Sequence, residues 1–320
     1  MPPTAIKLCE MSLRDGLQYL GGPGAEGSQL VPVPPRLRLL EALVAAGVRH
    51  VEAGAFVSPR GTPQMAASDE LGRLVDPDLV PGLELAALVP NEQGYERFRA
   101  TRFNVVATFP SANERHCRAN FGGRGVDEVL LLAAAVARRA RADGYRLRGH
   151  VSSAFQDIAT ATVSSDLDTV IRVCRAVLLD HGCEYLTLAD TNGTTRPARV
   201  IDVLDAVGNE LGGLDRIGVH LHDRDGAGIE NVHAAWETGV RIFDASLGGM
   251  GGSVAASRAA GEDAMRMAGN VATEAVAALL HARGAESGID VDRLVSVAGA
   301  ELRAICTAAG EEPPVRLPQG

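Results

Sequence analysis

The 320-residue sequence lacks several features that mark whole classes of protein. No apolar run reaches the roughly 18 residues that a membrane helix needs, and the opening residues, MPPTAIKLCE, show no secretory signal pattern. Basic residues are not in excess, because 31 lysines and arginines against 40 acidic residues give a net charge of −9. Nucleic-acid-binding proteins normally carry a basic face. We therefore expect neither a membrane nor a nucleic-acid partner.

Cysteine and aromatic residues are also scarce. Aromatic residues make up 4% of the chain, while 46% is hydrophobic and 22% is charged. These values indicate a globular protein and disfavour a disordered or collagen-like one. The cysteines are odd in number, widely spaced and form no CxxC pair: Cys9, Cys117, Cys174, Cys183 and Cys306. This usage predicts a reduced, cytoplasmic chain.

The sequence does contain a regular alternation of two kinds of segment. Short apolar or β-branched runs recur, and each is followed by a longer segment with helical spacing. The runs predicted as strands are Ile6–Ser12, His50–Ser58, Glu84–Pro90, Phe103–Phe109, Leu147–Ser153, Tyr185–Thr191, Ile217–Asp223 and Ile242–Leu247. The segments predicted as helices are Pro35–Ala46, Pro63–Leu74, Glu92–Ala100, Val126–Asp143, Leu167–His181, Pro197–Leu211, Ile229–Thr238 and Val271–Arg283.

This alternation indicates an α/β fold with a parallel sheet. About eight βα units match the size of a (β/α)₈ TIM barrel, with a doubly wound open sheet as the alternative. We expect a single catalytic domain over residues 1–320. The barrel would occupy about residues 5–285, and C-terminal helices and a tail would occupy about residues 286–320.

A barrel fold decides where the chemistry is expected, because catalytic groups lie at the carboxyl ends of its strands. Polar residues gather at or just after those ends: Arg14, Asp15, Glu52, Asn91, Asn113, Glu114, His150, Asp190, Thr191, His220 and His222. A polar side chain that points into a barrel costs stability unless it is paired. So many of them at one end predict a site.

His220 and His222 are candidates for metal binding, because residues i and i+2 of a strand point to the same face. Asp15 faces their strand across the top of a closed barrel and is a candidate third ligand. Histidine, carboxylate and amide ligands with open positions for water suit Mg²⁺, Mn²⁺ or another divalent ion better than a closed structural zinc site. Arg14 is placed to hold an enolate oxygen. A structural histidine pair and a surface turn are the alternatives.

Two glycine-rich segments interrupt the pattern. Residues 21–28 read GGPGAEGS, and residues 248–252 read GGMGG. Glycine lets a backbone approach a ligand closely or lets a loop close over a site. A flexible connection is the alternative for both.

Motifs along most of the chain combine into one family pattern. They are Ser12–Gln18 (SLRDGLQ), Val51–Ala53, Phe56–Pro59, Pro63–Ala66, Leu88–Asn91, Glu114 with Asn120, Arg148–Ser152, Asp190–Gly193, His220–Asp223, Gly248–Gly252 and Gly269–Glu274. Together they resemble the DRE-TIM metallolyases, a superfamily of metal-dependent aldolases and lyases. The similarity covers about residues 6–295 and is greatest to the 3-hydroxy-3-methylglutaryl-CoA lyase branch.

The resemblance implies a (β/α)₈ barrel with a divalent metal ion, Mg²⁺ or Mn²⁺. By motif position, the metal ligands would be Asp15, His220, His222 and Asn270. The same positions imply these further roles: Arg14 for the enolate, Glu52 and Asp190 for orienting the substrate and its hydroxyl, and Gln18, Thr191 and Glu274 for binding substrate or supporting the ligands.

The sequence departs from the family where proton transfer is expected. The family's glycine loop normally carries a catalytic cysteine, and Ser253 stands there in this chain, followed by Val254 in place of proline. A serine hydroxyl is far less acidic than a thiol. His150 replaces the family's usual tyrosine and is a candidate for proton transfer near neutral pH. Cys117 is the one other thiol expected near the mouth.

We therefore expect a divalent-metal-dependent carbon–carbon lyase or aldolase that acts through an enolate. The substrate would be a small hydroxy acid, oxo acid or acyl-CoA, and the changes around Ser253 favour one other than the usual acyl-CoA. The alternatives are a genuine hydroxymethylglutaryl-CoA lyase, a condensing enzyme that runs the same chemistry forward, and a non-catalytic metal-binding barrel. We expect the protein to be a homodimer.

Overall fold

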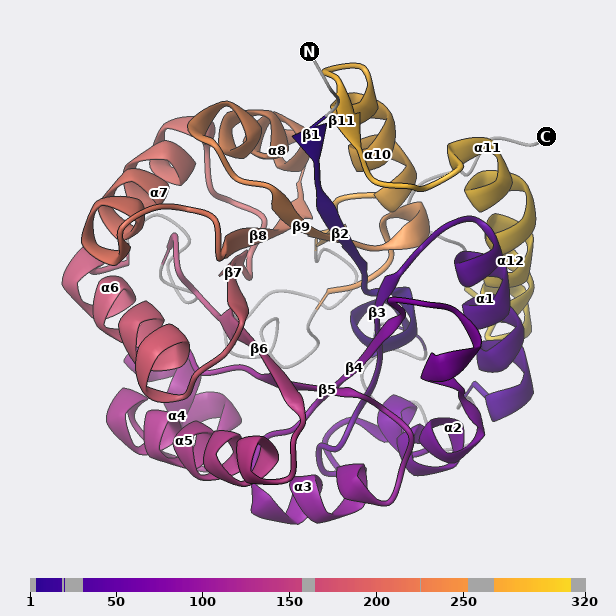
Figure 1. Ribbon diagram of the computed structural model, residues 1–320, viewed down its shortest axis with the longest axis horizontal. Coiled ribbons are helices and arrows are strands. Elements are labelled where there is room, and N and C mark those ends of the chain that lie inside the picture. The colour runs from indigo at the N-terminus through magenta and orange to yellow at the C-terminus, as the bar shows by residue number, and fades with distance from the viewer. Residues whose placement is uncertain are drawn as a thin grey trace.

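The computed structural model describes residues 4–18, 20, 31–156, 165–224, 226–252 and 268–311. Its centre is a ring of parallel strands inside a ring of helices (Figure 1). The ring of strands comprises β2 (Lys7–Glu10), β3 (His50–Ala55), β4 (Glu84–Leu88), β5 (Val105–Thr108), β6 (Arg146–Val151), β7 (Tyr185–Asp190), β8 (Ile217–Asp223) and β9 (Ile242–Ala245). Every predicted strand is present.

The sheet closes on itself. Each strand from β2 to β9 pairs in parallel with the next, and β9 also pairs in parallel with β2. A doubly wound sheet has two open edges, so the β2–β9 pairing excludes that alternative and confirms the (β/α)₈ barrel.

Helices cover the outside of the barrel (Figure 1). They are α1 (Val33–Ala45), α2 (Ser68–Leu74), α3 (Glu92–Arg99), α4 (Glu114–Asn120), α5 (Val126–Ala142), α6 (Leu167–Arg175), α7 (Pro197–Leu211), α8 (Ala227–Thr238) and α10 (Thr273–His281). The prediction for α7 has the observed bounds, because Pro197 opens the first turn and Gly212 ends the helix at φ 79°.

The predicted helix Pro63–Leu74 is instead two pieces. A short 3₁₀ turn, η3 (Pro63–Met65), precedes α2. The guanidinium of Arg36 donates to the carbonyl of Gln64, and the hydroxyl of Ser68 donates to the carbonyl of Met65 at 2.8 Å. Side chains thus take acceptors that a continuous helix would use.

Smaller elements complete the chain. The strands β1 (Thr4–Ala5) and β11 (Ala285–Glu286) pair beside the barrel, and β10 (Gly269–Asn270) pairs antiparallel with β8. The C-terminal elements α11 (Val291–Arg293), η8 (Leu294–Ala298) and α12 (Gly299–Ala308) follow, and η8 and α12 pack on α1. Among the described residues, no helix is long and apolar enough to cross a bilayer.

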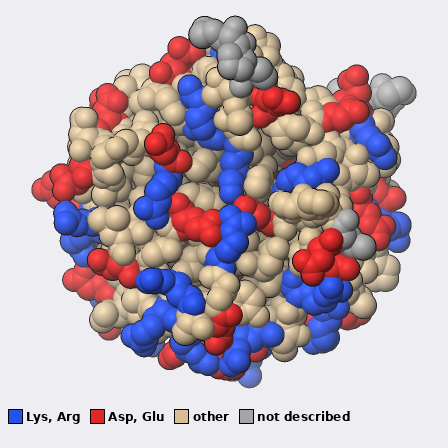
Figure 2. Space-filling view, in the orientation of Figure 1, with Lys and Arg blue, Asp and Glu red and all other residues tan. Residues whose placement is uncertain are grey.

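Charged side chains fill the end of the barrel where the strands begin. Glu84 Oε1 lies 3.1 Å from Lys7 Nζ and 2.8 Å from Arg146 Nη1, and Glu84 Oε2 lies 2.9 Å from His50 Nδ1. Arg146 Nε also donates to Glu184 Oε1 at 2.7 Å. Figure 2 shows acidic and basic side chains next to one another over the centre of the barrel.

Candidate active site

A single π-helical turn positions Arg14 and Asp15. The turn, η1 (Ser12–Gly16), begins two residues after β2 and is buried throughout. Single π-helical turns are frequent at functional sites. Here the turn carries both side chains over the carboxyl end of the barrel, as expected from the sequence.

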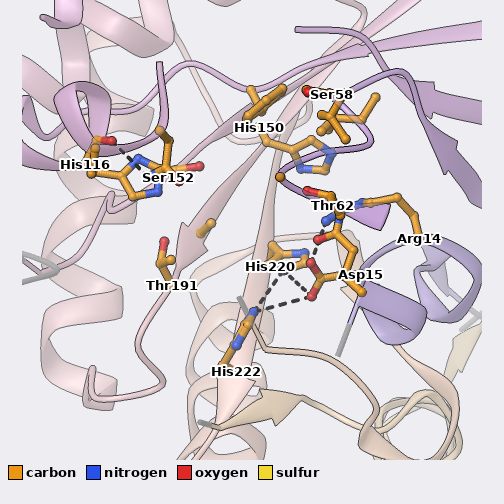
Figure 3. Close-up of a pocket in the computed structure, with 18 residues that line it drawn as sticks. Arg14, Asp15, Ser58, Thr62, His116, His150, Ser152, Thr191, His220 and His222 are labelled. Atoms are coloured by element: carbon orange, nitrogen blue, oxygen red, sulfur yellow. Dashed lines mark hydrogen bonds and ion pairs between the residues drawn. The ribbon is translucent and has the colours of Figure 1, made fainter. Parts of the chain in front are cut away.

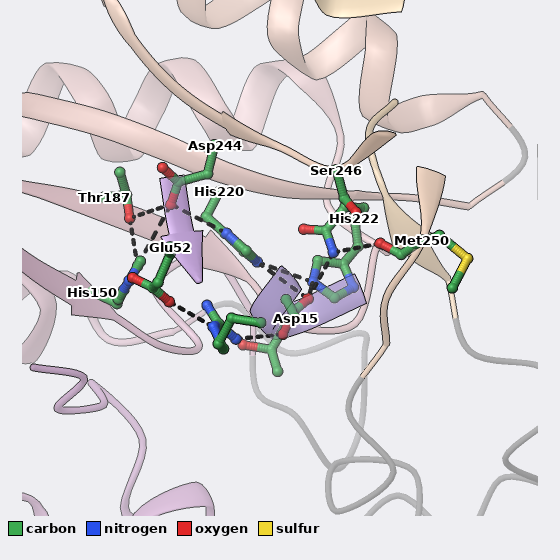
Figure 4. Close-up of polar contacts among 12 residues, drawn as sticks. Asp15, Glu52, His150, Thr187, His220, His222, Asp244, Ser246 and Met250 are labelled. Atoms are coloured by element: carbon green, nitrogen blue, oxygen red, sulfur yellow. Dashed lines mark hydrogen bonds and ion pairs between the residues drawn. The ribbon is translucent and has the colours of Figure 1, made fainter. Parts of the chain in front are cut away.

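The two histidines of β8 face each other in an arrangement that calls for a cation. Their Nε2 atoms lie 3.2 Å apart (Figures 3 and 4). His220 Nδ1 lies 3.2 Å from Asp244 Oδ2, and His222 Nδ1 lies 2.9 Å from the carbonyl of Ala268. Both partners accept, so a neutral ring carries its hydrogen on Nδ1 and leaves its Nε2 lone pair for a cation, either a proton shared between the two rings or a metal ion. Burial lowers the pKa of His222 to about 4, which keeps it neutral.

Asp15 and Asn270 complete this group. Asp15 Oδ2 lies 3.9 Å from His220 Nε2, 3.8 Å from His222 Nε2 and 2.6 Å from Asn270 Nδ2. Burial raises the pKa of Asp15, but the charge of Arg14 and the hydrogen bond from Asn270 oppose that effect, and the pKa falls to about 2. Asn270 Oδ1 is buried without a hydrogen-bond partner. Two imidazoles, a carboxylate and an unpaired amide oxygen form a donor set that fits a divalent cation.

The glycine loop after β9 packs directly on this group. Gly251 has φ +130°, and a Cβ there would lie 2.1 Å from Asn270 Nδ2 and 2.9 Å from Asp15 Oδ2. Asn270 Nδ2 also donates to the carbonyl of Met250 at 2.9 Å. The expectation that these glycines let the backbone approach the site closely is met at Gly251.

Arg14 is held by two carboxylates with part of its guanidinium left over. Its Nε donates to Glu52 Oε1 at 2.5 Å and its Nη1 to Asp15 Oδ1 at 2.5 Å. Burial lowers the pKa of Arg14, but these two carboxylates outweigh it and raise the pKa above its usual value. Nη2 has no protein partner among the described residues, and Arg14 lines the cavity.

His150 has both ring nitrogens in contact with the protein. Nε2 lies 2.9 Å from Glu52 Oε2, and Nδ1 lies 2.8 Å from Thr187 Oγ1. Burial lowers the pKa of this imidazole. His150 therefore braces Glu52, which in turn holds Arg14 (Figure 4).

Asp244 of β9 is a central residue that the sequence reasoning missed. Its carboxylate accepts from Arg148 Nη2 at 2.7 and 2.9 Å, from Thr187 Oγ1 at 3.0 Å and from His220 Nδ1. It thus fixes the orientation of His220 from below. The sequence did contain a signal for Asp244, because it is an acidic residue inside the apolar run Ile242–Leu247.

A cavity of about 420 Å³ opens beside these groups. The predicted site residues that line it are Arg14, Asp15, Gln18, His150, Thr191, His220 and His222. The others that the structure describes, Glu52, Asp190, Asn270 and Glu274, are not among the lining residues. Lining residues that sequence reasoning did not assign to the site include Ser58, Thr62, His116 and Ser152 (Figure 3).

Asp190 and Glu274 hold loops. Asp190 Oδ1 accepts from the amide of Gly193 at 3.1 Å and Oδ2 from that of Thr195 at 3.0 Å, and burial raises the pKa of Asp190 to about 6. Glu274 Oε2 accepts from the amide of Gly248 at 3.1 Å. Through these contacts, Asp190 and Glu274 hold the loops after β7 and β9.

Several polar residues expected at the site have structural roles instead. Asn91 caps α3 by accepting from the amide of Gly94, Asn113 caps α4 by accepting from that of His116, and Glu114 accepts from that of Val126. Cys117 is fully buried, and burial raises its pKa to about 11, so it offers no thiolate at the mouth. Ser253 and the GGPGAEGS segment lie outside the described residues.

Comparison with known proteins places the chain in a family. Residues 5–300 match the HMGL-like family. The chain is 36% identical over 293 residues to hydroxymethylglutaryl-CoA lyase of Pseudomonas mevalonii, covering 92% of this chain and 90% of the relative. It is 33% identical over 308 residues to (R)-citramalyl-CoA lyase of Chloroflexus aurantiacus, covering 91% and 88%.

A solved structure agrees with this placement. An HMG-CoA lyase from Acinetobacter baumannii in complex with coenzyme A and 3-methylmalate superposes with a TM-score of 0.83 at 26% identity, over 98% of this chain and 94% of the other. The barrel and the resemblance expected from the sequence are thereby confirmed. The chain belongs to the HMGL-like family and is an enzyme of its carbon–carbon lyase type.

Proposed function

We propose that the chain cleaves a carbon–carbon bond in the CoA thioester of a 3-hydroxy acid, by a divalent-metal-dependent retro-aldol reaction. The observation that carries this proposal is the pair of Nε2 atoms of His220 and His222, 3.2 Å apart and flanked by Asp15 and Asn270. Without a cation this arrangement costs stability, and with one it is a ligand set. We assign Mg²⁺ or Mn²⁺ to it, bound by these four side chains.

An ion held by these four side chains would supply Lewis acidity toward the substrate hydroxyl and lower its pKa. Arg14 then has the part of stabilising the enolate, because its Nη2 is available to the cavity while Nε and Nη1 are fixed by Glu52 and Asp15. Donors fixed in advance stabilise developing charge without reorganisation. The role of Glu52 is to hold Arg14, and that of Asp190 is to hold the loop that carries Thr191 into the cavity.

His150 and Ser253 are the two candidates for proton transfer. His150 must release Glu52 or Thr187 before it can exchange a proton with the substrate, so we favour a positioning role for it. A His150→Phe variant tests this role: loss of positioning lowers kcat without removing an ionisation from the kcat/KM pH profile. A catalytic role for Ser253 at the position of the family's cysteine stays a prediction, and Ser253→Ala measures its contribution.

A CoA-linked substrate has support from two sides. Relatives of this chain are named as lyases of hydroxymethylglutaryl-CoA and citramalyl-CoA. α4, which lines the cavity through His116, Ala119 and Asn120, also carries Arg115 and the exposed Arg118, whose charges suit CoA phosphates. A substrate outside the usual acyl-CoA and a homodimeric assembly stay predictions, the second open to size measurement in solution.

The test is metal-dependent cleavage. Purified protein is stripped of metal and incubated with 3-hydroxy-3-methylglutaryl-CoA, citramalyl-CoA or the corresponding free acids, with Mg²⁺, Mn²⁺ or neither. We expect acetyl-CoA from at least one thioester, only with metal, at about 1 s⁻¹ or faster. Cleavage of free acids alone, or of nothing despite bound metal, contradicts the proposal.

A further inference from the structure

The cavity has two chemically different halves. Arg14, Asp15 and the histidine pair occupy one. Figure 3 shows His116, Ser152 and Thr191 on the other side; together with Asn120 these residues are called the far half. Among the described lining residues, Arg14 and Asp15 alone carry fixed charges. The far half is therefore polar but uncharged.

His116 is held firmly at the wall of the far half. Its amide donates to Asn113 Oδ1 at 2.9 Å, and its carbonyl accepts from Asn120 Nδ2 at 2.9 Å. The residue is 7% exposed, and its side chain lines the cavity. These contacts fix the backbone of His116 at the cavity wall before any ligand arrives, which favours a role in recognition.

The same ring has unused hydrogen-bonding capacity. Nδ1 of His116 is buried without a partner. Burial lowers the pKa of His116 to about 4, so the ring is neutral at physiological pH. A buried nitrogen left unpaired costs stability, and most such groups in proteins have a partner. Nδ1 is shielded from the cavity, so Nε2, which is not among the buried unpaired atoms, is the ring nitrogen that a ligand in the cavity would contact.

Two hydroxyl groups of the far half also have hydrogen-bonding capacity left for a ligand. The backbone of Ser152 is fixed by bonds to Pro110 and Ala112 at 3.0 Å each, which leaves its hydroxyl to the cavity. Thr191 Oγ1 accepts from the amide of Ser153 at 3.1 Å, so its own hydrogen remains for another acceptor. Ser153 adopts φ +52°, a strained value for serine, to make this contact.

We propose that His116 is a specificity-determining residue, whose imidazole hydrogen-bonds an uncharged hydroxyl or amide group of the substrate in the far half. The inference rests on the proposed function for the identity of the ligand as an acyl thioester. An uncharged partner is favoured over a carboxylate, because no described lining residue of the far half carries a positive charge.

The group that His116 contacts has two sources, the acyl substituent or the amides of the pantetheine arm. Binding of three probes to the metal-loaded protein by calorimetry separates them. The probes are 3-hydroxy-3-methylglutaryl-CoA, its analogue with a hydroxymethyl group in place of the methyl group, and the N-acetylcysteamine thioester of the first acid.

Two variants and one control report on the imidazole. His116→Phe keeps a flat ring without nitrogen, and His116→Gln restores a hydrogen-bonding group. His181→Phe is the matched control, because His181 is 4% exposed, also has an unpartnered buried Nδ1 and does not line the cavity. Thermal melting checks that all three variants fold.

We expect His116→Phe to weaken binding about tenfold, the effect of one lost hydrogen bond, and His116→Gln to recover most of it. A loss confined to the hydroxymethyl analogue identifies the acyl substituent as the partner. An equal loss for both CoA thioesters, but not for the N-acetylcysteamine thioester, identifies the pantetheine arm.

Three results overturn the inference: affinities that stay within twofold in His116→Phe, a His116→Gln variant as weak as His116→Phe, or an equal loss in His181→Phe. Failure of the unaltered protein to bind any probe overturns it as well. Since binding needs no turnover, a protein that binds the probes without cleaving them refutes the proposed function and leaves the test of His116 valid.

Discussion

The two ends of the barrel solve the problem of buried charge in opposite ways. Where the strands begin, Glu84 lies within 3.1 Å of both Lys7 and Arg146, so acidic and basic groups satisfy one another. Where the strands end, the Nε2 atoms of two imidazoles lie 3.2 Å apart, and the buried amide oxygen of Asn270 has no partner. Both ends are polar, but the protein itself supplies the partners of the charged groups only where the strands begin.

This contrast separates stability from function. An ion-pair cluster in which every charge has a protein partner has a structural role and needs no ligand. An incomplete cluster lowers stability unless a ligand completes it, so it indicates binding. The middle of the barrel connects the two, because Asp244 pairs with Arg148 and also orients His220.

Metal removal should have the largest effect. With a chelator, turnover of the thioester should fall to background and return with Mn²⁺. His222→Asn keeps a donor for the carbonyl of Ala268 but removes Nε2, so it should lose the same activity.

The same variant should keep its stability. In metal-free urea unfolding we expect it to lie within about 1 kcal/mol of the unaltered protein, because it loses a repulsive contact. Mn²⁺ at about 100 times its Kd should stabilise only the unaltered protein, by about 2.7 kcal/mol. A variant stabilised equally by Mn²⁺ would refute the role of His222 as a ligand.

Loss of Arg14 ranks second. Arg14→Gln should lower kcat by about 10² to 10³, the range for removal of one oxyanion donor, with little change in bound metal per chain. Steady-state kinetics and metal analysis check both parts. More than a tenth of the activity in this variant would show that another group stabilises the enolate.

Glu84 at the opposite end should affect stability alone. Glu84→Gln should cost about 2 kcal/mol at pH 7, because it leaves Lys7 and Arg146 without a shared partner, and kcat should stay within twofold. Denaturant unfolding and kinetics measure the two. A change in kcat larger than the change in stability would break the separation between the ends.

The pH dependence of that effect follows from the ionisation of Glu84. Burial raises the pKa of Glu84, but contact with His50 and the charges of Lys7 and Arg146 outweigh it and hold the pKa below its usual range. The stabilisation is therefore present above the unfolded value of 4.5 and is lost as the pH falls through the folded value. The stability gap between Glu84→Gln and the unaltered protein should shrink below about pH 4.5.

Glu184 gives the smallest expected change. It pairs with the same Arg146, but both side chains are about 45% exposed. An exposed pair is worth about 0.2–1 kcal/mol and is screened by salt. Glu184→Gln should cost less than Glu84→Gln at every salt concentration, as measured by urea unfolding.

Much of the fold was predictable from local patterns. Strands and helices in a barrel repeat with little variation, and apolar runs such as Ile217–Asp223 are confined to one element. Exact ends were less predictable where side chains compete for backbone groups, as Arg36 and Ser68 do at Gln64 and Met65.

The site was predictable in part. Asp15, His220 and His222 follow from barrel geometry, since strand ends converge. Asn270 came from family resemblance alone, because nothing local distinguishes an amide on an approaching loop. His116 was missed because its role depends on the fixed backbone between Asn113 and Asn120, which only the folded chain shows.

The cation at the carboxyl end of the barrel is the central claim, and Mn²⁺ is its most direct probe. Pulsed electron paramagnetic resonance on the Mn²⁺-loaded protein reports nitrogen atoms bound to the ion, independent of turnover. We predict one Mn²⁺ per chain with coupling to two imidazole nitrogens, one of which disappears in His222→Asn. Mn²⁺ that binds without nitrogen coupling, or does not bind, would contradict the account.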